Sequence, residues 1–255
     1  MKDKPTILIT NDDGIFAPGI YALWEVMKKV GDVIVVAPDS EKSAVGHAIT
    51  ISNPIRMKKI NGHGEFSGYA VNGTPADCVK IAVKAILNDP PDIVISGINH
   101  GANVGNNIIY SGTVSAATEG TMLKIPSIAI SLNSIKGGDF TPAQKISKSI
   151  AELVLRNGLP DGVLLNVNVP NIPFDKILGY KVTRQGNIFF IDRFEKREDP
   201  RGQIYYWMTG EIMDDDVHND YDGQALKDNF VSVTPIHYQL TDEKFMNQLK
   251  RWDFQ

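Results

Sequence analysis

Two adjacent carboxylates directly follow a short uncharged segment near the beginning of the sequence. Residues 6–10 are Thr, Ile and Leu, and the residues after them are Asn11, Asp12, Asp13 and Gly14. Neighbouring carboxylates repel each other unless a positive charge lies between them, and a divalent metal ion is the simplest such charge. Asn, Asp and Gly are also common in solvated turns, so this segment alone is compatible with either a metal site or a turn.

Two further polar segments follow predicted strands and could lie beside these carboxylates. Residues 38–47 contain Ser40 and Ser43, and residues 96–105 contain Asn99. In a parallel sheet, the loops that leave the carboxyl ends of the strands lie at one edge. Carboxylate, hydroxyl and amide oxygens suit Mg²⁺ or Mn²⁺, whereas zinc fits less well because the histidines lack helical ligand spacing. The spacing does not decide between the two serines.

A fourth segment, Ser111-Gly112-Thr113, lies directly before a predicted helix. The free backbone N–H groups and the positive dipole end of a helix can hold a phosphate, although Ser and Thr also cap helices that bind nothing. The glycines of residues 96–105 do not follow the G-x-G-x-x-G pattern, and the sequence contains no G-x-x-x-x-G-K-[ST] motif. The sequence therefore lacks the main motifs that would indicate a nicotinamide-dinucleotide site or a P-loop nucleotide site.

The elements that would position these segments alternate between strand and helix through the first two thirds of the chain. This alternation predicts an α/β fold with a mostly parallel sheet covered by helices. The predicted strands are residues 6–10, 32–37, 93–96, 127–132 and 163–169. Thr74, Pro75 and Asp77 predict a capped helix that extends to residue 87, and Thr141 is predicted to begin another helix in the same way. Two more helices are predicted over residues 18–30 and 113–124.

The pattern changes after Arg184. Residues 186–194 and 203–210 read as aromatic strands, which predicts a β-hairpin arm that contacts another subunit or packs on its own core. A final strand over 230–234 and a helix over 242–252 complete the chain. We therefore predict a catalytic core over residues 1–184 and an extension over 185–255 that contains the arm, the last core strand and the terminal helix.

Composition narrows the classes of partner. The 255 residues carry a net charge of -4, which gives no general attraction to duplex nucleic acid or to an acidic membrane surface. The one cysteine, Cys78, excludes an internal disulfide and lies in an apolar helical pattern that favours a core position. No apolar run approaches the roughly 18 residues of a membrane span. We expect a soluble, cytoplasmic protein.

Several motifs follow one another in a fixed order along the chain, at residues 10–14, 37–38, 43–47, 72–78, 96–99, 111–115, 205–211 and 233–236. Together and in this order they resemble the SurE survival-protein family of 5'-nucleotidases, and the resemblance extends over nearly the whole chain. Residues 61–68 and the last few residues match less clearly, which leaves substrate preference and arm geometry open.

The resemblance implies a metal-dependent phosphatase that acts on nucleoside monophosphates. It implies a three-layer, Rossmann-like core, with an arm exchanged between the subunits of a homodimer or homotetramer. One divalent cation per subunit, Mg²⁺ or Mn²⁺, is expected. Carried over by position, its ligands would be Asp12, Asp13, Ser43 and Asn99.

In the resulting hypothesis, the two aspartates are catalytic as well as metal-binding, and one of them accepts the proton of an attacking water. The groups expected to contact the substrate phosphate are Ser43, Asn99, Ser111, Gly112 and Thr113. Both aspartates can reach one ion only if the chain leaves strand geometry after residue 10, a turn that Gly14 favours.

Other interpretations remain open from the sequence. An aspartyl nucleophile is possible in place of water, although the acid-x-acid spacing of aspartate-nucleophile phosphatases is missing. The same groups could serve a nucleotide sensor that binds phosphate without cleaving it, or the acidic loops of an oligomeric scaffold could simply be solvated. No sequence pattern indicates which base is preferred, whether 3'-monophosphates or polyphosphate are substrates, or which metal is native.

Overall fold

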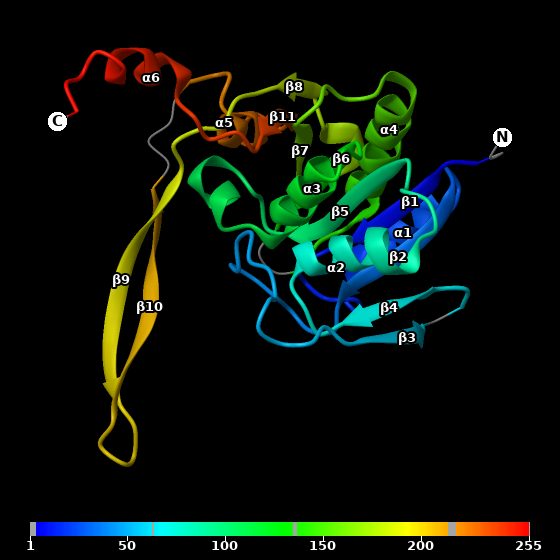
Figure 1. Ribbon diagram of the computed structural model, residues 1–255, viewed down its shortest axis with the longest axis horizontal. Helices are drawn as coiled ribbons and strands as arrows, with labels where there is room; N and C mark the ends of the chain where they lie inside the picture. Colours follow the sequence, from blue (N-terminus) through cyan, green and yellow to red (C-terminus); the bar gives the residue numbers. More distant parts are fainter. Residues whose placement is uncertain (1–3, 63, 135–136, 214–217, 255) are drawn as a thin grey trace.

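A nine-stranded sheet forms the centre of the described part of the chain, which comprises residues 4–62, 64–134, 137–213 and 218–254 of this computed structural model (Figure 1). The strand order is β3-β4-β2-β1-β5-β6-β7-β11-β8. Strands β1, β2, β4, β5, β6 and β7 pair in parallel, while β3 and β11 run antiparallel to β4 and β7. The bounds of the strands are β1 (Thr6–Thr10), β2 (Asp32–Pro38), β3 (Met57–Asn61), β4 (Ser67–Val71), β5 (Ile93–His100), β6 (Ser127–Asn133), β7 (Val163–Pro170), β8 (Tyr180–Val182) and β11 (Val231–His237).

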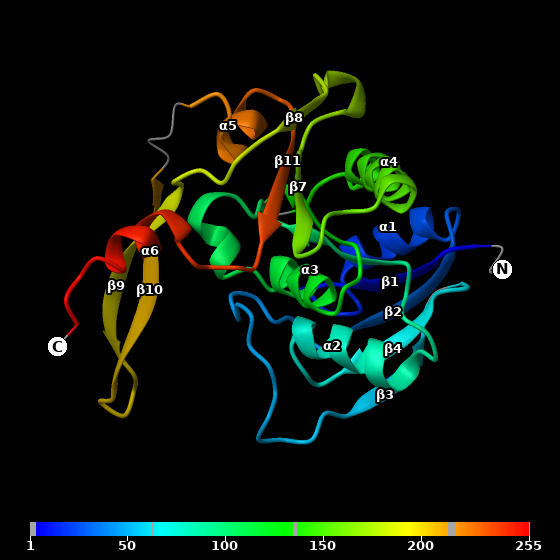
Figure 2. The same cartoon turned by 45° about the horizontal axis from the view of Figure 1, so that its top comes forward.

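Strand β1 is buried on both faces, which explains its continuous apolar sequence. Successive side chains of a strand point to opposite faces. Ile7 and Ile9 accordingly pack with α1 (Pro18–Met27) and α4 (Thr141–Asn157), whereas Leu8 packs with α2 (Pro75–Ile81) and α3 (Gly112–Met122). Figure 2 shows α1 beside α4 and α2 beside α3. The predicted three-layer, mostly parallel α/β fold is confirmed.

The helix ends follow local sequence signals at α2, whereas α1, predicted to extend to residue 30, ends at Met27. At α2, Thr74 accepts a hydrogen bond from the backbone N–H of Asp77, and the Asp77 side chain accepts one from the N–H of Thr74, as the capping-box motif predicts. The helix then changes to a π-helical turn over Ala82–Ile86. At α4 the prediction of Thr141 as a cap is wrong, because the helix already includes Thr141 and its cap position is Phe140, which makes no side-chain hydrogen bond.

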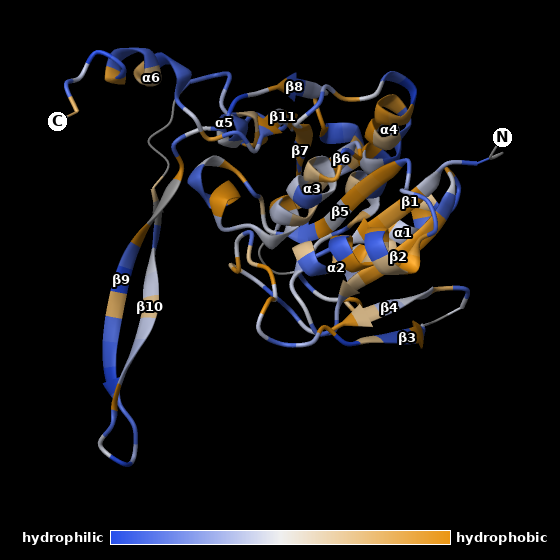
Figure 3. Ribbon diagram, in the orientation of Figure 1, coloured by the Kyte–Doolittle hydropathy of each residue, from blue (hydrophilic) through white to orange (hydrophobic). Residues whose placement is uncertain are grey.

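The carboxyl-terminal part leaves the core and then returns to it. Strands β9 (Phe189–Glu198) and β10 (Ile204–Met213) form the predicted hairpin, which projects from the core (Figures 1 and 2). Figure 3 shows β9 as mostly hydrophilic and β10 as intermediate in hydropathy, and the side chains of Phe194 and Trp207 are exposed. The chain then forms α5 (Asp222–Lys227), β11 of the main sheet, and α6 (Glu243–Leu249). Within the described residues, no helix combines the length and apolar character that crossing a membrane requires.

Candidate active site

The first three polar segments predicted from the sequence meet at the carboxyl ends of β1, β2 and β5. These strands are neighbours in the sheet, and Thr10 pairs with Ser96 in the last register of β1 and β5. The N–H of Lys42 donates to the carbonyl of Asp12 at 2.7 Å, which joins the first and second segments. The N–H of His100 donates to Oδ2 of Asp13 at 3.3 Å, which joins the first and third segments.

Asp12 is the most constrained group of the site. Its side chain lies against the amino-terminal end of α3, where the hydroxyl of Thr113 donates to Oδ1 in a very short hydrogen bond. A Cβ added at Gly112 would lie 2.7 Å from Cβ of Asp12, so only glycine allows this approach. Asp12 is only 5% exposed, and burial raises its pKa to about 6. The hydrogen bond from Thr113 opposes this shift without cancelling it, and the charge of Asp13 raises the pKa further. The fourth segment therefore joins the other three.

Asp13 is more exposed than Asp12 and points toward the end of β5. Burial still raises its pKa, although the hydrogen bond from the backbone of His100 opposes the shift. The chain leaves strand geometry after β1, as a shared site for both aspartates requires, and Gly14 has a φ of 96°. The side-chain amide of Asn11 donates to the carbonyl of Gly14 at 2.9 Å, so Asn11 stabilises the turn.

Asn99 and Ser43 each have a side-chain oxygen that remains available to a ligand. Nδ2 of Asn99 donates to the carbonyls of His100 and Gly101 at 3.1 and 2.9 Å, which leaves Oδ1 as the atom available to a ligand. Ser43 is exposed and donates its hydroxyl proton to Glu41 at 2.6 Å, so the lone pairs of its Oγ remain available. Ser40 likewise donates to Asp39, at 3.0 Å.

These donors fit a hard divalent cation. Within the described residues, no three His, Cys, Asp or Glu side chains form a metal-binding cluster, and the predicted set accordingly contains only two carboxylates together with a hydroxyl and an amide. The pKa values of the two adjacent carboxylates are raised, chiefly by burial, and oxygen donors of this kind suit Mg²⁺ or Mn²⁺. The predicted donors are therefore of the chemical type that a divalent cation requires, and the cation itself stays a prediction.

The start of α3 provides donors for an anion. Ser111 caps the helix by accepting a hydrogen bond from the N–H of Val114 at 3.1 Å, which is the capping role that the sequence left open. Its O–H proton stays available to a ligand. The first backbone N–H groups of an α-helix have no partner inside the helix, so Gly112 presents such a donor beside Asp12.

Two residues of the region carry a buried polar atom that has no hydrogen-bond partner among the described residues. His100 ends β5 with a buried Nδ1 that has no hydrogen-bond partner among the described residues, and its ring packs edge-on against Phe140. Oδ1 of Asn11 is likewise buried and unpartnered within the described part of the chain. Buried polar atoms without partners are rare. Among the described residues, Thr10, Asn11, Ser96 and His100 carry such atoms in β1 and β5 or directly after β1, whereas another lies on Asn166 of β7. Cys78, by contrast, is fully buried in the core, where burial raises the pKa of its thiol.

Comparison with known proteins shows which family the chain belongs to. The model of the family described as survival protein SurE matches residues 7–191. The chain belongs to the SurE family. A protein named 5'-nucleotidase SurE from Syntrophobacter fumaroxidans is 50% identical over 247 residues, which are 97% of this chain and 99% of that protein. The protein of the same name from Christiangramia forsetii is 50% identical over 257 residues, with 98% of each chain covered.

A solved SurE structure shares the fold. The crystal structure titled Sure protein from Aquifex aeolicus matches with a TM-score of 0.84 and 44% identity, and the match covers 96% of this chain and 98% of that one. The resemblance inferred from the sequence motifs is thus confirmed across nearly the full length. The SurE-family match also spans all the predicted site residues, which lie between Asp12 and Thr113.

Proposed function

We propose that this SurE-family protein releases phosphate from nucleoside 5'-monophosphates and requires one divalent cation per subunit. Relatives named 5'-nucleotidases share 50% of their residues with it over nearly the whole chain, which supports a nucleotidase activity. The observation that carries the proposal is the buried carboxylate of Asp12. It lies next to Asp13, at the point where β1 ends and α3 begins, and such a charge needs a cation to be stable there.

The cation would be held by oxygen atoms from three loops. Asp12 and Asp13 provide the negative charge, and Oδ1 of Asn99 and Oγ of Ser43 complete the set of protein donors. When bound, a divalent cation supplies positive charge to the phosphate oxygens and lowers the pKa of water. Mg²⁺ and Mn²⁺ are the candidates because every donor is a hard oxygen.

The chain's own groups would bind and orient the phosphate. The O–H of Ser111 and the N–H of Gly112 donate toward the region beside Asp12, where the positive end of the α3 dipole also favours an anion. Thr113 uses its hydroxyl on Asp12 and thereby fixes the carboxylate orientation. These donors stabilise charge on the phosphate oxygens that the cation does not reach.

Asp13 is the better placed aspartate to accept a proton from water. It is partly exposed, whereas Asp12 is buried and engaged by Thr113. A carboxylate that accepts this proton lets water attack the phosphorus directly, so no covalent aspartyl intermediate is required. We therefore favour water as the nucleophile.

The decisive experiment measures phosphate release from a panel of 5'- and 3'-nucleoside monophosphates with several divalent ions. Release should stop in chelator and return with Mg²⁺ or Mn²⁺. Asp12→Asn and Asp13→Asn should each lower turnover by at least about 100-fold while the protein stays folded. Nucleotide binding without phosphate release would instead identify a sensor, and unchanged release in chelator would rule out the metal dependence.

We further propose that residues 1–184 form the catalytic core. The extension over residues 185–255 would then join two or four identical subunits through the β9–β10 arm. We also propose that the protein acts in the cytoplasm. The arm exposes Phe194, Tyr206 and Trp207, which is unusual for a surface that stays in water. The single cysteine fits a reducing compartment. Light scattering of the whole protein and of a Trp207→Glu variant tests the assembly, which the variant should weaken.

A further inference from the structure

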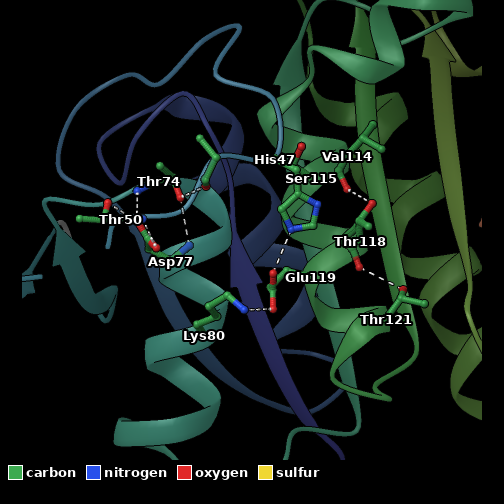
Figure 4. Close-up of polar contacts among 12 residues, drawn as sticks. His47, Thr50, Thr74, Asp77, Lys80, Val114, Ser115, Thr118, Glu119 and Thr121 are labelled. Atoms are coloured by element: carbon green, nitrogen blue, oxygen red, sulfur yellow. Dashed lines mark hydrogen bonds and ion pairs between the residues drawn. The ribbon is translucent and has the colours of Figure 1, made fainter. Parts of the chain in front are cut away.

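A carboxylate in the middle of α3 is buried and has two cationic partners from other elements. The side chain of Glu119 is 3% exposed; Oε1 accepts a hydrogen bond from Nζ of Lys80 at 2.6 Å, and Oε2 lies 2.9 Å from Nε2 of His47 (Figure 4). Although burial raises the pKa of Glu119, the bonds from His47 and Lys80 outweigh it and lower the pKa. Glu119 is therefore a buried anion that contributes no atom to the proposed metal site.

His47 belongs to the loop that carries Ser43. The loop connects β2 to β3 without a helix or strand of its own over the described residues 39–56, so contacts with other elements must determine its path. At its beginning, the N–H of Lys42 donates to the carbonyl of Asp12. Four residues after Ser43, the ring of His47 contacts Glu119. Ser43 thus lies between one attachment at the metal site and one at α3.

A second attachment holds the same loop farther along. The N–H and the hydroxyl of Thr50 donate to the carboxylate of Asp77 at 3.0 and 2.6 Å, and the hydroxyl of Thr74 donates to the carbonyl of Ala48 (Figure 4). Thr50 lies seven positions after Ser43, so this attachment alone leaves enough chain for Ser43 to move. On that side, the attachments nearest to Ser43 are the backbone hydrogen bond from Gly46 to the carbonyl of Tyr110 and the contact of the His47 ring with Glu119. Among the side-chain attachments, the His47 contact is nearer to Ser43 along the chain than those at Ala48 and Thr50.

We propose that Glu119 is a positioning residue that acts through His47: it holds the loop against α3 and so sets the location of the Ser43 hydroxyl at the metal site. The role of Ser43 as a ligand rests on the proposed function. Lys80 balances the buried charge of Glu119, so that the carboxylate can remain ionised and hold the histidine. Because α3 also supplies Gly112 and Thr113 beside Asp12, this one helix positions both Asp12 and the loop that carries Ser43.

The test compares Glu119→Ala, His47→Ala, the double variant and His47→Gln in the full-length protein. Each is assayed for the Mn²⁺ concentration that gives half-maximal phosphate release, and for turnover at saturating Mn²⁺. Groups that orient metal ligands affect metal affinity on the order of 10- to 100-fold, so each alanine variant should raise the half-saturating concentration by at least about 10-fold. Turnover at saturation should stay within about two-fold. The double variant should match the single ones, because both break the same contact.

His47→Gln and Thr50→Val serve as matched variants. The amide nitrogen of the glutamine can donate to Glu119, so His47→Gln should recover most of the metal affinity. Thr50→Val removes the hydroxyl that donates to Asp77 from the same loop and should lower stability without changing the half-saturating concentration. An equal shift in Thr50→Val, additive effects in the double variant, or an unchanged Mn²⁺ requirement in folded Glu119→Ala would each overturn the proposal.

Hydrogen exchange of the metal-free protein separates this inference from the proposed function. The N–H of Gly46 is bonded to the carbonyl of Tyr110, so a peptide covering residues 43–50 reports whether the loop is held. Glu119→Ala should speed exchange in this peptide at least about ten-fold, and slow exchange equal to that of the wild type would overturn the inference. If the wild type releases no phosphate with any divalent ion, the proposed function fails, and this exchange measurement still decides whether Glu119 holds the loop.

Discussion

Replacing Asp12 by Asn should make the metal-free protein more stable while it removes activity. The carboxylate of Asp12 is 5% exposed, and its pKa rises from 3.8 to about 6 on folding. The folded state therefore binds this proton more tightly than the unfolded state does. For a group of this kind, the free energy of unfolding decreases as the pH rises from about 4 to about 6, and the loss is complete above the folded pKa.

The size of the change in stability follows from the pKa shift of Asp12. A change of one pKa unit corresponds to about 1.36 kcal/mol, so the shift from 3.8 to about 6 costs the ionised, metal-free protein about 3 kcal/mol. Asn is similar in shape and uncharged, and its Oδ1 can still accept the hydrogen bond from Thr113. One kcal/mol shifts the melting temperature of a protein of this size by about 2–4 °C, so Asp12→Asn should raise it by roughly 6–12 °C in chelator at pH 8.

Calorimetry in chelator at pH 8 and pH 5 checks this prediction. At pH 5 the difference between wild type and variant should fall to roughly half, because the native carboxyl is then mostly protonated while the unfolded one is still ionised. Asp89→Asn is the control, since Asp89 is exposed and its replacement should change stability by less than about 0.5 kcal/mol. Added Mn²⁺ should stabilise the wild type and not the variant. A lower melting temperature for Asp12→Asn in chelator at pH 8 would refute the electrostatic reasoning.

Three further predictions concern the surroundings of the site. Gly112→Ala places a Cβ 2.7 Å from that of Asp12, so α3 must shift and phosphate release should fall at least about 10-fold, measured at saturating metal. Thr74→Ala removes the acceptor for the N–H of Asp77 and should lower the free energy of unfolding in urea by about 1 kcal/mol. Cys78 should react with a thiol reagent only as the protein unfolds, so rapid modification of the native protein would contradict its buried position.

The central strands could be predicted because burial on both faces imposes an apolar sequence. Strand β1 has the predicted bounds, and the observed β2, β5, β6 and β7 begin at the predicted residues. Of the strands that the sequence did not predict, β3 and β8 lie at the two edges of the sheet, and β4 lies between β3 and β2. The sequence of β3 contains Lys58 and Lys59, both exposed, and β8 pairs with β11 alone and has only three residues. Edge strands of this kind carry little apolar periodicity, because at most one face is buried.

The site could be predicted in part, to the extent that sheet topology determines it. Asp12, Asp13 and Asn99 follow or end neighbouring parallel strands, so their convergence follows from the fold class. The sequence could not show that Thr113 donates to Asp12, because this contact depends on how closely α3 approaches β1 across 101 residues of chain. The preference for Ser43 over Ser40 came from the family resemblance, and it stays a prediction, since both hydroxyls donate to neighbouring acids.

The contact between His47 and Glu119 could not be predicted from the sequence either, because the two residues are 72 positions apart in the chain. In the sequence, Glu119 looks like an ordinary charged residue of a helix, and only the packing of α2 and α3 shows that it is buried. Burying the carboxylate of Glu119 costs free energy unless partner groups compensate its charge, and both of its oxygens have such partners in Lys80 and His47. The first turn of α3 engages Asp12 and its middle engages the loop of Ser43. A displacement of this one helix would therefore move donors on two sides of the proposed site together, which is why we regard α3 as the element on which the geometry of the site depends.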